Sequence, residues 1–239
     1  MRKSTLLVAV LLTVFTAYGQ YFNIRDPFHS FATILTSVVP YNGNYYCTGI
    51  AWDSSNYLGN GQGANKWGIK FTIFNGNGDK LKDTIYQRDD KFNLDGWSNN
   101  LKPMPGGHFL LMTGSKDTAY SAYNLHSNLF LFDSSGKVLW QTEYNLPVSC
   151  AVFFNAVDFK PDSNGNWLLL STISCNGGHN QMNLMKLDSG FHLLWNKQYG
   201  SNVSDAATKI LVDKDGGYIL AGTRSNIPLI YQNFSSYAC

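Results

Sequence analysis

Few residues of this chain are equipped for catalysis. Glu143 is the only glutamate among the 239 residues. Glycoside hydrolysis requires two positioned carboxylates, so a catalytic pair in this chain needs an aspartate as its second member. The five histidines show no pairing at metal-ligand spacing, and neither a His-Glu-x-x-His nor a Gly-x-Ser-x-Gly motif is present. These residue types favour binding over catalysis.

Two short loops space oxygen donors in a way that also suits calcium. They read NGNGD at 75–79 and DSNGN at 162–166. Neither loop is followed by the bidentate glutamate of an EF-hand, and Asn or Asp beside Gly is what tight turns prefer. We therefore expect turns without a metal or cofactor, with calcium binding as the alternative.

A repeat with a period of about 55 residues organises the chain. Residues 128–144 read NLFLFDSSGKVLWQTEY, residues 183–199 read NLMKLDSGFHLLWNKQY, and a weaker copy, KFTIFNGNGDKLKDTIY, lies at 70–86. A second motif alternates with the first and consists of a Gly/Asn turn followed by an aromatic residue and an apolar run, as in DKDGGYILAG at 213–222. Short apolar runs joined by such turns are typical of antiparallel hairpins.

Each unit therefore predicts four short antiparallel strands, and the repetition of such units is the pattern of a β-propeller. The units fall near 30–88, 95–145, 153–200 and 206–239, and the last keeps only its first two strands. We expect an all-β fold of about three and a half four-stranded antiparallel blades, incomplete or open, with almost no helix. This count favours an N-terminal portion of a longer propeller, and an open arc is the alternative.

The most regular side chains recur at the offset of 55 residues. We interpret them as structural, because the tryptophans and tyrosines among them would fill the wedge between adjacent blades. A platform on which a ligand stacks is the alternative. The recurring residues are Asp133, Trp140 and Tyr144, repeated as Asp188, Trp195 and Tyr199.

Residues 1–19 are predicted to be a secretory signal peptide. Arg2 and Lys3 precede an apolar run over 6–15, and small residues stand before Gln20. The apolar run is too short to span a bilayer, so we expect no membrane span after cleavage. Residues 20–239 then form the repeat domain, secreted or at the cell surface, in the periplasm or outside the cell. The chain has 18 basic and 16 acidic residues, so removal of Arg2 and Lys3 leaves it formally neutral. A neutral chain argues against nucleic acid as a partner.

The alternation of D-x-x-G-x-x-x-W and a tyrosine with D-G-G-Y-I-L-A-G resembles secreted β-propeller repeat proteins of Bacteroidota. The matching stretches are 128–144, 183–200 and 207–223. The resemblance implies blades similar to those of quinoproteins and export like that of type IX secretion cargo. It is specific for architecture and implies no particular activity.

In a blade, the loop that enters the first strand and the loop between the second and third strands emerge on one face. Cys150 and Cys175 lie in these two loops of one unit, so we expect a disulfide between them, with two free thiols as the alternative. The same face carries the longer loops, near 54–66, 88–97, 115–127 and 174–181, where ligand sites are expected. The candidate ligand-binding residues there are Tyr57, Asp95, Trp97, His126 and His179.

These observations lead to one functional hypothesis and two alternatives. The hypothesis is a secreted, non-catalytic β-propeller that binds a glycan or a cell-surface protein, or acts as a scaffold. The first alternative is a secreted propeller enzyme, either a quinoprotein-like dehydrogenase or a glycosidase. The second is a structural protein of a surface assembly.

Overall fold

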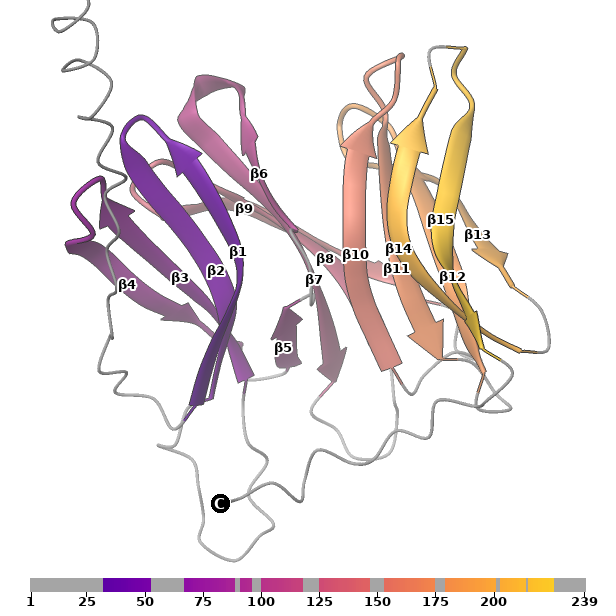
Figure 1. Cartoon of the computed structure of the whole chain (residues 1–239), viewed down its shortest axis with the longest axis horizontal. Coiled ribbons are helices and arrows are strands. Elements are labelled where there is room, and N and C mark those ends of the chain that lie inside the picture. Colours follow the sequence, from indigo (N-terminus) through magenta and orange to yellow (C-terminus); the bar gives the residue numbers. More distant parts are fainter. Residues whose placement is uncertain are drawn as a thin grey trace, which may run out of the picture.

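The computed structural model describes residues 32–52, 67–88, 91–95, 100–117, 125–146, 153–174, 179–200, 203–213 and 215–225. Within these ranges the regular structure is β-strand, apart from one short 3-10 turn at Pro105–Gly107. Successive groups of strands form separate sheets that stand side by side along an arc (Figure 1). The predicted all-β fold of propeller-like antiparallel sheets is confirmed.

Two of the sheets are complete four-stranded blades. Each pairs its strands in chain order, with antiparallel neighbours throughout. Blade 1 consists of β1 (Ala32–Tyr41), β2 (Asn44–Trp52), β3 (Trp67–Asn75) and β4 (Lys80–Tyr86). Blade 3 consists of β10 (Phe153–Pro161), β11 (Trp167–Ser174), β12 (Asn180–Leu187) and β13 (Leu193–Tyr199). The described part of blade 4 consists of β14 (Ser204–Val212) and β15 (Tyr218–Ser225).

Blade 2 differs in its first strand, which is broken into two pieces. Both β5 (Lys91–Asp95) and β6 (Leu101–Met104) pair with β7 (His108–Asp117), followed by β8 (Leu125–Phe132) and β9 (Val138–Asn145). The other three first strands are continuous and carry a β-bulge instead. The strand β5 corrects our expectation of a loop over 88–97, because β7 extends to Asp117 and its far half offers backbone groups that require a partner.

Four of the turns within the blades share one geometry. In the turn between β8 and β9, Asp133 Oδ1 accepts hydrogen bonds from the backbone N–H groups of Ser135 (2.8 Å) and Lys137 (2.9 Å). Asp188 is bonded in the same way in blade 3, and so are Asn75 and Asp162, the first residues of the two loops with calcium-like spacing. In these two loops the side-chain oxygens therefore stabilise backbone turns.

Apolar clusters lie between the blades. The cluster between blades 2 and 3 joins Leu110, Met112 and Leu129 of one to Phe159 and Leu169 of the other, all fully buried. At its edge the Trp140 ring lies 5.0 Å from that of Phe191, which stacks on Trp167 at 5.7 Å. One blade further on, the Trp195 ring lies 6.1 Å from the Tyr218 ring. Both repeated tryptophans therefore contact an aromatic residue of the next blade.

A tyrosine at the end of the fourth strand links blade 1 to blade 2 and blade 2 to blade 3. Tyr144 Oη donates a hydrogen bond of 2.6 Å to the Phe191 carbonyl oxygen, in the turn before β13. Tyr86 makes the same bond from blade 1 to the Gly136 carbonyl of blade 2. Burial raises the pKa of Tyr144 to about 12, so this hydroxyl remains a donor throughout the physiological pH range.

The tyrosine link predicts a stability difference between two repeat-equivalent positions. Tyr144→Phe removes the hydroxyl and leaves the Phe191 carbonyl without this partner, which should lower the free energy of unfolding by about 1–2 kcal/mol. Tyr199→Phe is the matched control, because Tyr199 is 37% exposed and its loss should cost less than about 0.5 kcal/mol. Urea unfolding of both variants measures the two values. Equal losses would contradict the link.

A second prediction concerns acid stability. Burial tends to raise the pKa of Asp162, but hydrogen bonds from Lys186 (2.8 Å to Nζ) and from Asn166 outweigh it and lower the pKa to about 2. A carboxyl with a depressed pKa in the folded state stabilises the fold above its ordinary pKa, and this contribution is lost as the pH falls towards 2. Asp162→Asn keeps the turn acceptor without the charge. The free energy of unfolding, measured at several pH values between 4 and 2, should therefore fall less steeply with decreasing pH for this variant than for the unchanged protein. The same slope in both proteins would refute the assignment.

Candidate functional site

The face of blade 2 that looks toward blade 1 changes from apolar to polar along its length. Side chains of a strand alternate between faces, so His126, Asn128, Phe130 and Phe132 of β8 share one face. Phe130 and Phe132 are buried in the cluster between blades 1 and 2. His126 and Asn128 continue the same face toward the loops, and both are buried. The polar residues therefore extend the interblade packing surface to the loop side of the sheet.

Strand pairing arranges these polar residues in two rows across the sheet. The first row contains Thr113, Asn128 and Glu143, and the second contains Ser115, His126 and Asn145. The Asn128 amide donates a hydrogen bond of 2.8 Å to Ser115 Oγ and so connects the rows. Polar side chains from three strands thus lie close together at one end of blade 2.

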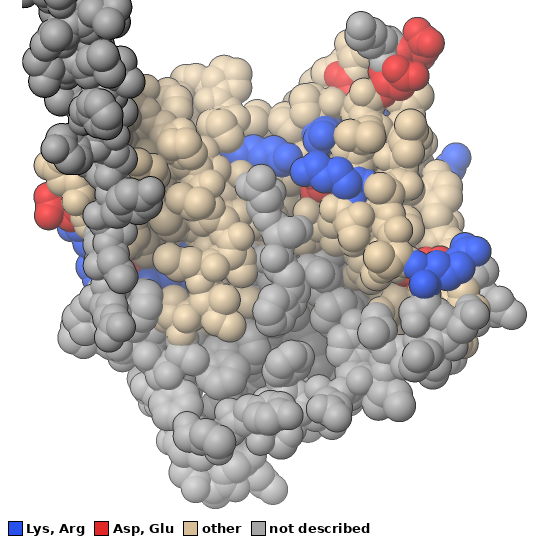
Figure 2. All heavy atoms as spheres, in the orientation of Figure 1, with Lys and Arg blue, Asp and Glu red and all other residues tan. Residues whose placement is uncertain are grey.

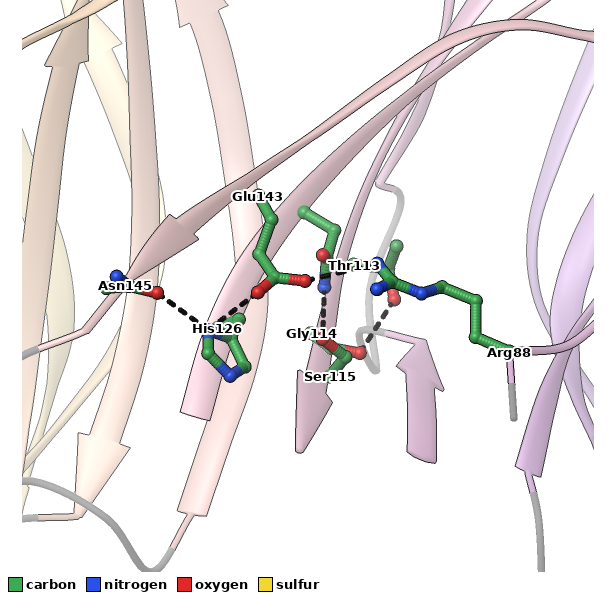
Figure 3. A network of polar contacts seen from close by, with 8 residues as sticks. Arg88, Thr113, Gly114, Ser115, His126, Glu143 and Asn145 are labelled. Atoms are coloured by element: carbon green, nitrogen blue, oxygen red, sulfur yellow. Dashed lines mark hydrogen bonds and ion pairs between the residues drawn. The ribbon is translucent and has the colours of Figure 1, made fainter. Parts of the chain in front are cut away.

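Glu143 lies at the centre of the contacts in Figure 3. Its Oε1 is 3.0 Å from His126 Nδ1, and its Oε2 accepts a hydrogen bond of 3.2 Å from Arg88 Nη1. His126 Nδ1 also lies 3.0 Å from Asn145 Oδ1. The exposed fractions of the side chains rise from 7% for His126 through 25% for Glu143 to 33% for Arg88. The network therefore runs from a buried imidazole to a guanidinium that reaches solvent.

This arrangement is suited to hydrogen bonding with a polar ligand. The Glu143 carboxylate is held on both oxygens, and Arg88 presents a fork of donors that is fixed on one side. Sites for small polar ligands combine a few such positioned polar groups with an apolar surround, here the buried phenylalanines of β8. Among the described residues, no group of three His, Cys, Asp or Glu side chains is placed to hold a metal ion.

The network departs from the repeat. At the repeat offsets, Glu143 corresponds to Gln198 in blade 3 and to Ile85 in blade 1. His126 corresponds to Gln181 and Gly68. The blade fold does not require these two side chains, because the neighbouring blades form without them. Comparison of the repeats with one another is the signal that could have found Glu143, which our candidate residues did not include.

The remaining sequence candidates fall in different places. His179 precedes β12, partly buried and apart from the network. The backbone of Asp95 pairs with Thr113, in the row that leads to Glu143. Residues 1–19, Tyr57, Trp97 and the pair Cys150 and Cys175 lie outside the described residues, so the signal peptide, those two ligand contacts and the disulfide stay predictions. Cys47 is a buried free thiol, and burial raises its pKa to about 11.

A cavity of about 300 Å³ lies beside the two described strands of blade 4. Arg224 and Asp205 form an ion pair of 2.7 Å in its wall. Tyr199 also lines this cavity and occupies the repeat position of Tyr144, whose hydroxyl is bonded to a third-strand turn of the next blade. The residues that line the cavity come from blade 3 and blade 4.

Comparison with known proteins shows the fold class to which this chain is similar. Neither a protein-family model nor a curated protein matches this chain. An endo-arabinase from Bacteroides thetaiotaomicron superposes with a TM-score of 0.51 and 14% identity, over 84% of this chain and 74% of that one. An ulvan lyase from a new polysaccharide lyase family superposes with a TM-score of 0.51 and 12% identity, over 79% of this chain and 48% of the lyase. The chain spans about half the length of that lyase.

The fold likeness and the four-stranded antiparallel sheets define an all-β protein of the β-propeller type. At identities of 14% and 12%, the likeness describes the fold and leaves the chemistry to be argued from the site. In the described part of the chain, no helix has the length and apolar character needed to cross a membrane.

The ion pair between Arg88 and Glu143 predicts a modest, salt-dependent coupling. Both side chains are partly exposed, and exposed pairs contribute about 0.2–1 kcal/mol. A double-mutant cycle with Arg88→Met and Glu143→Gln should give a coupling free energy within that range at low salt, falling at 1 M NaCl. A coupling of zero at both salt concentrations would show that the two side chains do not interact in solution.

Proposed function

We propose that this protein is a secreted β-propeller that binds a glycan through the loop-side end of blade 2, without cleaving it. The observation that carries the proposal is the Arg88–Glu143–His126 network, which has no equivalent at the repeat positions of the neighbouring blades and which reaches solvent through Arg88. Carboxylate, guanidinium and amide groups that are held in place are the partners that sugar hydroxyls require. The names of the two structural neighbours, an endo-arabinase and an ulvan lyase, support a glycan as the ligand class.

The alternative, a propeller enzyme that cleaves a glycan, is suggested by the names of the same two neighbours. A glycosidase would need a second carboxylate near Glu143. Asp95 is the acidic residue that strand pairing places in the same row, through Thr113 and Asn128. Three interstrand spacings of about 4.8 Å separate the backbones of Asp95 and Glu143 by about 14 Å. The paired carboxyl groups of glycosidases are about 5–10 Å apart. A catalytic pair would therefore require the two side chains to lean toward each other along the row.

The proposal predicts a glycan ligand whose affinity depends on the network. A glycan array that includes linear arabinan should show binding by the purified chain. Glu143→Gln and Arg88→Gln should each weaken that binding about tenfold, because a charge-assisted hydrogen bond contributes about 1.5–3 kcal/mol. Lys137→Gln, an exposed substitution in the turn before β9, is the control that should leave affinity unchanged.

Two outcomes would count against the proposal. A folded chain that binds no glycan on the array would remove its support. Release of reducing ends from a bound glycan, abolished by Glu143→Gln and by Asp95→Asn, would establish the enzyme alternative in its place. Tyr57 and Trp97 remain predicted ligand contacts, so alanine at either position should also weaken binding.

A further inference from the structure

A row of lysines crosses the inner side of the arc, away from the blade 2 network. The strands β10 and β14 lie at the edges of their sheets and contact each other, and β6 begins the inner side of blade 2. Figure 2 shows basic side chains in a band across the middle of this surface, with an acidic one between them. Ion pairs join Lys102 on β6 and Lys209 on β14 to Asp158 on β10, and Lys160 follows two residues later on β10.

Asp158 is the fixed centre of the row. Its side chain is 2% exposed, and its Oδ1 accepts a hydrogen bond of 2.9 Å from Lys102 Nζ. Its Oδ2 accepts a hydrogen bond of 3.3 Å from the backbone N–H of Ile210 and lies 3.5 Å from Lys209 Nζ. Blades 2 and 4 therefore both place donors on one buried carboxylate of blade 3, as a buried charge requires.

The row carries more positive charge than Asp158 neutralises. Lys160 stands two residues beyond Asp158 on the same side of β10, about 7 Å along the strand. Among the described residues Lys160 forms no ion pair, and the nearest acidic residue along the strand, Asp162, is paired with Lys186 at 2.8 Å. The row thus holds three ammonium groups and one carboxylate, and two of the three are paired with that carboxylate.

The lysines differ in their freedom to meet a ligand. Lys102 is held by Asp158 and lies over the Phe159 ring, 5.0 Å from its centroid. Lys209 has a side chain that is 49% exposed, and Lys160 is partly exposed. Lys102 and Asp158 therefore act as positioning residues, while Lys160 and Lys209 are the groups that reach solvent.

We infer that Lys160 and Lys209 bind the anionic group, a carboxylate or a sulfate ester, of an acidic glycan. One ammonium is enough to neutralise Asp158, so the other two leave an excess of positive charge that an anion can offset. A surface with an excess of one sign of charge also raises the local concentration of ligands of opposite charge. The inference rests on the proposed glycan-binding function and names the class of glycan.

Affinity electrophoresis of the purified chain tests this inference with three polymers. Polygalacturonate carries carboxylates, dextran sulfate carries sulfate esters, and linear arabinan is neutral. At least one acidic polymer should retard the chain more than arabinan does, and the retardation should fall as NaCl is raised. The polymer that retards it more identifies the anionic group.

A matched pair of double variants locates the site. Lys160→Gln with Lys209→Gln should weaken binding to the acidic polymer about a hundredfold, since two charge-assisted contacts that contribute about tenfold each are lost. Lys137→Gln with Lys197→Gln removes the same charge at exposed positions on blades 2 and 3 and should change affinity less than about twofold. Both pairs lie on partly or fully exposed side chains, so the fold should persist, and thermal unfolding verifies this.

Three outcomes would overturn the inference. Equal losses in the two double variants would mean that the net charge of the chain causes the retardation. Binding to arabinan with no preference for either acidic polymer would remove the anionic site and leave the proposed glycan binding intact. Retardation by none of the three polymers would remove both.

Discussion

The packing of apolar side chains between adjacent blades is the constraint on which this structure depends. A four-stranded sheet has two faces, and here the buried side chains of neighbouring blades cover them. The turn before β13 shows the strength of this requirement. Phe191 has a φ of 66° where the equivalent turns have glycine, a conformation that costs a non-glycine residue about 1–2 kcal/mol. Its ring contacts Trp140 and Trp167, and burial of an aromatic side chain contributes about 1.5–3 kcal/mol.

The same constraint explains where polar residues gather. The apolar half of each blade face is committed to packing, so polar side chains collect at the loop end, as on β8, or at the inner strands. Glu143 and His126 occupy the loop end in blade 2, and Asp158 occupies the inner side between blades 2, 3 and 4. Both groups use donors from more than one blade, so a functional surface in this fold depends on the packing that sets the blades side by side.

Much of the architecture could be predicted from the sequence because its signals are local. Turn residues at fixed offsets and alternating apolar positions predict the hairpins, and their repetition predicts the blades. The predicted His126 does lie in the polar network, but Arg88 and Glu143 are 55 residues apart and meet only when two blades pack. Lys102 and Asp158 are 56 residues apart and meet for the same reason. In the sequence, Glu143 can be recognised only because it departs from the repeat. Such a departure indicates a position of interest but does not show which residue it contacts. The strand β5 was not predicted from the sequence. Residues 91–95 form a strand because their backbone pairs with β7, a partner that the sequence of this short segment does not reveal.

The central claim is that equivalent aromatic side chains join one blade to the next. Nuclear Overhauser effects between ring protons of Trp140 and Phe191, and between those of Trp195 and Tyr218, test it in solution. The ring centroids of these pairs lie 5.0 Å and 6.1 Å apart, so cross-peaks are expected for both. Absence of both cross-peaks in the folded protein, with the two indole rings in unrelated surroundings, would contradict the account.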